Sequence, residues 1–304
     1  MKSVAQHHFP RYVFRDGKKL LWNPVLKNTF IDRPEEKVRL QILDYLILEA
    51  GFSTSRISFE SPVNLPKDKS ASRTDVICFD KNFKPLLLIE CKAPEISLTE
   101  KASIQIARYN QIIEAPILLI SNGLEDLWYE TDSDSIINLK NIPDEFSPKS
   151  VIETDYRYWC ERGFLGSKSN PEIQTWLLQS CETLFGSKND SSASYFKFEG
   201  TSPDLFMANF YRIFSKNNSL KLALSLTSTP LGTTKLNGVL NIKGANKALF
   251  SCSLDLLYSG DSKNTVLQSA SGLSQIDLSK EIGFDFKTSL TDHVLSMSQF
   301  LSAL

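Results

Sequence analysis

Apolar positions follow two different periods along the first 130 residues. A broad apolar stripe at helical spacing begins after Pro34, a residue favoured in the first turn of a helix, and stops at Gly51. Later runs rich in β-branched and aliphatic residues are typical of buried strands, and polar residues at 80–82 predict a tight turn between two of them. In chain order, we expect a small hairpin at 12–22, helix 34–50, strand 56–60, two strands within 73–80 and 85–92, helix 97–114 and a buried strand at 115–120.

The pattern is less regular beyond residue 130. Residues 131–150 are polar and are interpreted as a connecting segment, and residues 186–194 have the composition of a linker. From residue 202 a helix is expected to include Leu205 and Phe214, and later strand-like runs separated by glycines predict an antiparallel meander. The expected elements are helices 171–184, 202–214 and 291–304 and strands 220–227, 236–242, 248–257 and 272–278.

The order helix, three strands, helix, strand predicts a mixed sheet with a helix on each face. The expected fold class is therefore α/β for the first part of the chain, followed by a smaller α+β domain that contains the meander. We expect three segments: a first domain at 1–150, a helical connector at 151–190, and a domain at 191–304 that serves binding, dimerisation or sensing.

The composition is that of a globular protein, with 41% hydrophobic and 23% charged residues in 304. No apolar run approaches the roughly 20 residues of a membrane helix, and the first residues lack the apolar core of a signal peptide. The five cysteines show no paired spacing, which favours reduced thiols in the cytoplasm and argues against a zinc cluster. We therefore expect a cytoplasmic protein with no membrane partner.

The net charge is low for a protein that grips nucleic acid chiefly by electrostatics. The whole chain carries −1, and residues 191–304 hold ten basic and eight acidic residues, so the first 190 residues carry −3. Any contact with nucleic acid must come from local basic patches such as residues 11–19 or 67–73. The alternative is that these patches are ordinary solvated faces.

Three charged residues mark the ends of the two central strands. Glu90 and Lys92 are two apart and emerge on one face, while Cys91 points to the other. Antiparallel pairing places Asp75 beside Glu90. Neighbouring carboxylates repel unless one is protonated or a cation lies between them, and carboxylate oxygens suit Mg²⁺. The alternative is an exposed strand end with solvated charges, although the four apolar residues before Glu90 argue against it.

Two pairs of polar residues on the predicted helices are further candidates. Glu35 lies at the front of the buried stripe of the first helix, with Glu36 beside it as the nearest rival. The alternative is that both acids only favour the helix N-terminus through its dipole. Gln105 and Tyr109 lie one turn apart on the flank of the second helix.

Several short segments occur in a specific order along this part of the chain. They are Pro34-Glu-Glu-Lys-Val-Arg39, Arg73-Thr-Asp75, Leu88-Ile-Glu-Cys-Lys-Ala-Pro94, Gln105-Ile-Ala-Arg-Tyr-Asn110 and Ser121-Asn-Gly123. This ordered set resembles the nuclease-like N-terminal domain of type I restriction enzyme R subunits over roughly residues 10–130. An Asp followed after fourteen residues by Glu-x-Lys is also the pattern of the PD-(D/E)xK nucleases.

The resemblance implies a restriction-endonuclease-like core that cleaves DNA with Mg²⁺, for which Mn²⁺ can substitute. Asp75, Glu90 and the backbone carbonyl of Cys91 are implied as metal ligands, and Lys92 as the residue that positions the water nucleophile. Thr74 stands where the name-giving proline of the pattern would be, a position that is often replaced in the family. The implied catalytic set is Glu35, Asp75, Glu90, Lys92, Gln105 and Tyr109, and the implied nucleic-acid contacts are Arg73, Gln105 and Arg108.

Three functions remain open at this point. The chain contains no G-x-x-x-x-G-K-[ST] segment, so ATP-driven translocation by this chain is excluded. The first function is a Mg²⁺-dependent DNA endonuclease of a restriction or defence system. The second is a catalytically silent nucleic-acid-binding or assembly subunit with the same fold, against which the complete set Asp75, Glu90 and Lys92 argues. The third is a nuclease that acts only with a partner, either a second copy of the chain or another restriction subunit.

Overall fold

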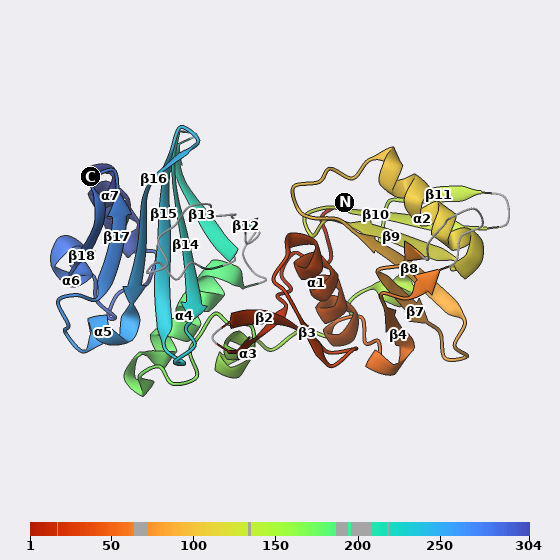
Figure 1. Cartoon of the computed structure of the whole chain (residues 1–304), viewed down its shortest axis with the longest axis horizontal. Helices are drawn as coiled ribbons and strands as arrows, with labels where there is room; N and C mark the ends of the chain where they lie inside the picture. Colours follow the sequence, from red (N-terminus) through yellow and green to blue (C-terminus); the bar gives the residue numbers. More distant parts are fainter. Residues whose placement is uncertain are drawn as a thin grey trace. The chain divides into compact units, whose positions relative to one another are not determined.

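The computed structural model of the protein describes residues 1–16, 18–63, 72–132, 135–186, 194–195, 208, 210–217 and 219–304. The chain forms two compact units, Met1–Ile152 and Glu153–Leu304 (Figure 1). Among the described residues, none of the helices combines the length and the apolar character needed to span a lipid bilayer. The division into three segments at residues 150 and 190 stays a prediction.

The first unit contains a six-stranded mixed sheet, a three-stranded antiparallel sheet and a two-stranded pair. Its elements are β1 (Arg11–Arg15), β2 (Lys18–Asn23), β3 (Asn28–Phe30), α1 (Pro34–Leu48), η1 (Thr54–Arg56), β4 (Ile57–Phe59), β5 (Pro62–Val63), β6 (Ser72–Arg73), β7 (Val76–Phe79), β8 (Pro85–Cys91), α2 (Glu100–Ile113), β9 (Ile117–Ser121), β10 (Asp126–Thr131), β11 (Ile136–Leu139) and η2 (Asp144–Phe146). The central sheet has the order β11-β10-β9-β8-β7-β4, in which β8 and β9 are parallel and the other neighbours antiparallel.

The two long helices of this unit pack on opposite faces of the central sheet. Leu88 of β8 lies in one apolar cluster with Ala102 and Ile106 of α2. Leu87 and Ile89 alternate with Leu88, so they face the other side of the sheet, where they are fully buried and where α1 contacts β8. The predicted mixed sheet with a helix on each face is confirmed.

The segment 131–150 is not the simple connector that its polar composition suggests. Strand β11 extends the central sheet at its edge, and its four residues are flanked by polar segments that dominate the composition of 131–150. Phe146 is fully buried and stacks on Phe52 with ring centroids 5.5 Å apart. Its carbonyl oxygen also accepts a hydrogen bond from the hydroxyl of Tyr45 in α1.

The N-terminal residues pack against the rest of the first unit through polar contacts. The backbone N–H of Val4 donates to Asp126 Oδ2 at 2.8 Å. Buried His8 lies between two carboxylates, with Nδ1 3.0 Å from Asp44 Oδ2 and Nε2 3.6 Å from Glu49 Oε1. Burial alone lowers the pKa of His8, but these two carboxylates outweigh burial and raise the pKa above its ordinary value of 6.5. These contacts of the His8 imidazole tie the N-terminal segment to α1 and to Glu49, which follows α1.

The second unit is built on an antiparallel meander, as predicted. Its elements are α3 (Tyr156–Glu161), η3 (Pro171–Ile173), α4 (Gln174–Phe185), β12 (Ser194–Tyr195), β13 (Phe210–Asn217), β14 (Leu220–Ser228), β15 (Thr234–Ile242), β16 (Ala245–Ser253), α5 (Leu254–Tyr258), β17 (Thr265–Ser269), β18 (Gly272–Ile276), α6 (Leu278–Ile282) and α7 (His293–Ser302). The strands β12 to β18 lie in sequence order in one sheet, α4 packs on β13 and β14, and α5 and α7 contact β15 (Figure 1).

Some sequence predictions for this unit are wrong. Residues 210–214 belong to strand β13 rather than to the end of a helix, because residues 210 and 211 pair with β12 and residues 212–214 pair with β14. The run 248–257 divides into the end of β16 and the short helix α5, and β17 was not expected because Gln268 and Ser269 interrupt its apolar pattern. Parts of three predicted segments lie outside the described residues. They are residues 64–71, with most of the 67–73 patch, residues 187–193, with most of the predicted linker, and residues 201–207, with the start of the predicted helix.

The close approach of α1 to the loop after β9 can be tested with two alanine variants. Gly123 in this loop has φ +79°, and a Cβ there would lie 3.2 Å from Val38 Cγ2 of α1. Gly51 has a similar φ of +73°, but its nearest neighbour would be 3.8 Å away. Alanine at either position introduces left-handed strain of roughly 1 kcal/mol, and we expect Gly123→Ala to lose about 1 kcal/mol more because Val38 must move. Equal losses in urea unfolding would contradict this packing.

The His8 contacts predict a pH dependence of the stability of the first unit. Because the folded pKa is raised, the stabilisation is fully present below the ordinary pKa of 6.5 and is lost as the pH rises through the folded pKa. We expect the difference in unfolding free energy between wild type and His8→Gln to shrink from about pH 6 to about pH 9. His7→Gln removes the neighbouring histidine and is the control. A difference that grows with pH would contradict the interpretation.

Candidate active site

The register of β7 against β8 brings the two predicted carboxylates together. Val76 pairs with Ile89 in the antiparallel ladder, so Asp75, one residue earlier, lies opposite Glu90, one residue later. Asp75 Oδ2 accepts a hydrogen bond of 2.6 Å from the backbone N–H of Cys91. Both carboxylates are buried, with 7% of Asp75 and 3% of Glu90 exposed, and the thiol of Cys91 is fully buried on the other face. The side-by-side arrangement expected from the sequence is therefore present.

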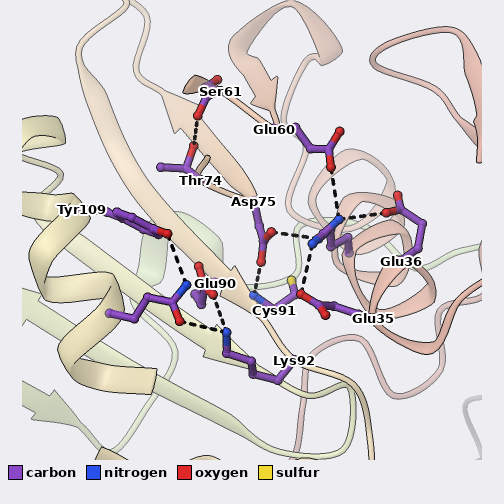
Figure 2. Close-up of polar contacts among 12 residues, drawn as sticks. Glu35, Glu36, Glu60, Ser61, Thr74, Asp75, Glu90, Cys91, Lys92 and Tyr109 are labelled. Carbon is purple, nitrogen blue, oxygen red and sulfur yellow. Dashed lines mark hydrogen bonds and ion pairs between the residues drawn. The ribbon is translucent and has the colours of Figure 1, made fainter. Parts of the chain in front are cut away.

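Lys92 follows β8 directly and links the sheet to α2. Its ammonium group donates to Glu90 Oε1 at 2.6 Å and to Gln105 Oε1 at 3.2 Å. Gln105 Nε2 donates in turn to the hydroxyl of Tyr109 at 3.3 Å, and Tyr109 is buried in the apolar cluster between α2 and the sheet. The backbone N–H of Lys92 donates to the carbonyl of Ser121 at 2.8 Å. Figure 2 shows that the side chains from Glu90 to Tyr109 form one continuous row of hydrogen bonds.

A guanidinium group from α1 lies on the other side of Asp75. Arg39 Nε is 2.8 Å from Asp75 Oδ1. Its Nη1 is 2.9 Å from Glu36 Oε2 and 3.4 Å from Glu60 Oε1, and its Nη2 is 3.0 Å from Glu35 Oε1. Two of these acids come from the first turn of α1 and one follows β4, so a single cation contacts four carboxylates from three parts of the chain (Figure 2).

Burial and charge both act on the acid–base behaviour of this site. Burial raises the pKa of Asp75, which the nearby Arg39 guanidinium and the Cys91 N–H only partly oppose. Burial and the neighbouring Asp75 charge raise the pKa of Glu90. Burial alone lowers the pKa of Lys92, but the Glu90 carboxylate outweighs it and the pKa is raised. Lys92 is therefore an ammonium group at neutral pH.

The donor set at this sheet end fits a hard divalent cation. Two buried carboxylates, Asp75 and Glu90, lie beside each other with raised pKa values, and a cation between them removes their repulsion. The carbonyl of Cys91 lies between Glu90 and Lys92 in the chain and is an oxygen donor of the kind that Mg²⁺ accepts. Within the described ranges, no group of three or more His, Cys, Asp or Glu side chains could hold a metal ion, so such a site rests on two carboxylates and a backbone oxygen.

The remaining predicted residues lie around this centre. Arg73 is exposed at the end of β6, two residues before Asp75, and Arg108 is exposed on α2, three residues after Gln105. Thr74, which stands at the proline position of the motif, is buried, and both its N–H and its hydroxyl donate to the carbonyl of Ser61. Thr74 therefore fixes the backbone that leads into Asp75 (Figure 2).

The surroundings of Arg39 go beyond the expectations from sequence. The spacings from Glu35 and Glu36 to Arg39 are those of neighbouring side chains on a helix, so two of its partners have a sequence signal. Nothing in the sequence links Arg39 to Glu60, which is 21 positions away. Of the two rival acids in α1, Glu36 is the buried one, with 6% of the residue exposed, whereas 43% of the Glu35 side chain is exposed.

Comparison with known proteins agrees with the family that the motifs indicate. A search of the curated proteins found no match. A protein-family model matches residues 34–143, just over a third of the 304 residues, and this segment contains α1, β7, β8 and α2. The match begins later than the residue 10 expected from the resemblance and extends past β11. Residues 34–143 of this chain are thus identified as the segment that matches the type I restriction enzyme R protein N terminus.

Proposed function

We propose that the first unit is a restriction-endonuclease-like, Mg²⁺-dependent nuclease domain that hydrolyses phosphodiester bonds of DNA in a restriction or defence system. The observation that carries the proposal is the convergence of Asp75, Glu90 and Lys92 at one end of β7 and β8. The family match of residues 34–143 supports the restriction context.

Each residue has a distinct role in the proposed reaction. Asp75, Glu90 and the carbonyl of Cys91 hold the cation, which when bound polarises a phosphate and lowers the pKa of a water molecule. Lys92 carries a positive charge beside Glu90 and positions the attacking water or neutralises developing charge on the phosphate. Gln105 holds the ammonium group of Lys92 from the side of α2.

Tyr109 and Glu35 complete the proposed catalytic set. The hydroxyl of Tyr109 accepts the hydrogen bond that orients Gln105, so Tyr109 acts on Lys92 through a second side chain. Glu35 contacts Arg39 and helps to hold α1 against the acidic end of the site. Neither residue needs to touch the reacting atoms for these roles.

DNA must reach an acidic site, and exposed basic side chains nearby support this. Arg73 precedes Asp75 by two residues, and Arg108 and Gln105 lie on the same helix. A cationic side chain that contacts a phosphate releases counterions, which makes binding dependent on salt. We propose these three residues as contacts to the DNA backbone. A second copy of the chain or another restriction subunit is the proposed partner that supplies further DNA contacts, and ATP has no role in this chain.

A second candidate function is a catalytically silent subunit that binds nucleic acid or assembles with other subunits. The observation that favours it is that both carboxylates already have cationic partners, Arg39 at Asp75 and Lys92 at Glu90. The proposed role of residues 191–304 in binding, dimerisation or sensing fits either function. The two functions differ in whether the bound DNA is cut.

Nuclease activity is the direct test. We expect the purified chain with Mg²⁺ or Mn²⁺ to nick or degrade DNA, and Asp75→Ala and Lys92→Ala to lower the rate at least about a hundredfold. Lys84→Ala removes an exposed lysine at the other end of the β7–β8 hairpin and should keep wild-type activity. Equal cleavage by wild type and all variants would identify a contaminant. DNA binding by wild type without cleavage under any metal condition would favour the silent subunit.

The proposed DNA contacts predict a change in salt dependence. In the double variant Arg73→Gln, Arg108→Gln, two phosphate contacts are lost, so the slope of log affinity against log salt concentration should fall by about 2. Fluorescence anisotropy with labelled duplex and single-stranded DNA measures this slope, and the double variant Lys81→Gln, Lys84→Gln, which removes two exposed charges between β7 and β8, is the charge-matched control. An unchanged slope would mean that these arginines do not contact the backbone.

A further inference from the structure

Arg39 is the most heavily engaged cation at the candidate site. Its side chain is 17% exposed, and its three nitrogens lie 2.8–3.4 Å from carboxylate oxygens of Asp75, Glu35, Glu36 and Glu60. A guanidinium group keeps its charge at any ordinary pH, and here its pKa is raised further because the surrounding carboxylates outweigh its burial. Arg39 is therefore a permanent positive charge against the proposed metal ligand Asp75.

Negative charge nevertheless exceeds positive charge around this arginine. Glu36 is 94% buried, since 6% of it is exposed, and its Oε1 has no hydrogen-bond partner among the described residues. Glu35, Glu36 and Glu60 line a hollow of about 400 Å³ together with Arg33 and Arg39. Burial and the neighbouring acids raise the pKa of Glu36, which is the expected response to charge that is not fully balanced.

We propose that Arg39 is a positioning residue that competes with the divalent cation for Asp75: it holds the acidic cluster together in the metal-free protein and keeps metal affinity low. The inference rests on the proposed function, because it needs Asp75 to be a metal ligand. It goes beyond that function by assigning to α1 the residue that sets how tightly the metal binds.

The geometry explains why Arg39 can compete and still remain in place. Asp75 Oδ2 is held by the N–H of Cys91, and Oδ1 faces Arg39 Nε. A cation at Asp75 lies next to a fixed positive charge, and like charges a few ångström apart repel strongly in a buried site. The three glutamates keep Arg39 in its position when Asp75 turns its charge toward the cation. Asp75 is therefore the group that exchanges partners.

The test is the affinity of the full chain for Mn²⁺, measured by electron paramagnetic resonance of free and bound Mn²⁺ without DNA. In Arg39→Gln we expect the Mn²⁺ dissociation constant to fall about tenfold or more, because a repelling charge is removed from a buried site. The metal-free variant should unfold at a lower temperature than wild type, and Mn²⁺ should raise its unfolding temperature by more than it raises that of wild type.

Arg33→Gln is the matched control. Arg33 is exposed, lines the same hollow and lies six residues before Arg39, so its loss removes an equal charge without touching Asp75. We expect less than about a twofold change in Mn²⁺ affinity for this variant. Unchanged or weaker Mn²⁺ binding by Arg39→Gln would overturn the competition. The absence of Mn²⁺ binding in wild type and both variants would overturn the metal-dependent function itself, which separates the two failures.

A second measurement follows Arg39 in the wild-type protein and needs a variant only for assignment, Arg39→Lys, which keeps the positive charge. In arginine-labelled wild-type protein, the Arg39 Nε–Hε resonance, assigned by its absence in Arg39→Lys, should shift as Mg²⁺ is added, because the contact to Asp75 changes. The Arg33 resonance should stay in place. An Arg39 resonance that does not move at saturating Mg²⁺ would overturn the proposal.

Discussion

The antiparallel register of β7 against β8 is the constraint on which the candidate site depends. The pairing of Val76 with Ile89 places Asp75 opposite Glu90, and a slip of one residue would send one of these carboxylates to the other face of the sheet. The register is held by fully buried side chains on both faces, among them Leu87 and Leu88. Packing of the apolar core of the hairpin thus determines where the carboxylates at its polar end lie.

The acids at this end are offset by two cations, Lys92 after β8 and Arg39 in α1. Lys92 is steadied through Gln105 of α2, and Arg39 enters from α1 on the opposite face. An unpaired buried carboxylate is strongly destabilising, so removal of either cation affects folding as well as chemistry. The same few residues therefore affect both the stability of the fold and the proposed activity.

Local pattern predicted most of the first unit and the proximity of its site residues. The helix that begins at Pro34, the β7–β8 hairpin and the contact between Gln105 and Tyr109 all follow from periodicity and turn chemistry. The site has further partners that periodicity does not reveal. The contact between Arg39 and Glu60 joins elements that are distant in sequence, and no local preference encodes it.

The errors in the remainder of the fold have equally specific causes. The run around Phe210 is apolar enough for a helix and becomes a strand because β12 and β14 pair with it. Strand β11 is missed because its four residues form a very short run inside an otherwise polar segment. The apolar pattern of one segment thus fails as a predictor where pairing with a neighbouring strand decides the structure.

The buried thiol of Cys91 offers a way to measure local opening at the end of β8. Cys91 is fully buried, and burial raises the pKa of its thiol well above the ordinary value. Since alkylating reagents attack the thiolate, modification of this cysteine requires the strands to separate first. The rate of its covalent labelling in the native protein therefore measures how often the end of β8 opens, and ligands that close the site would slow that reaction.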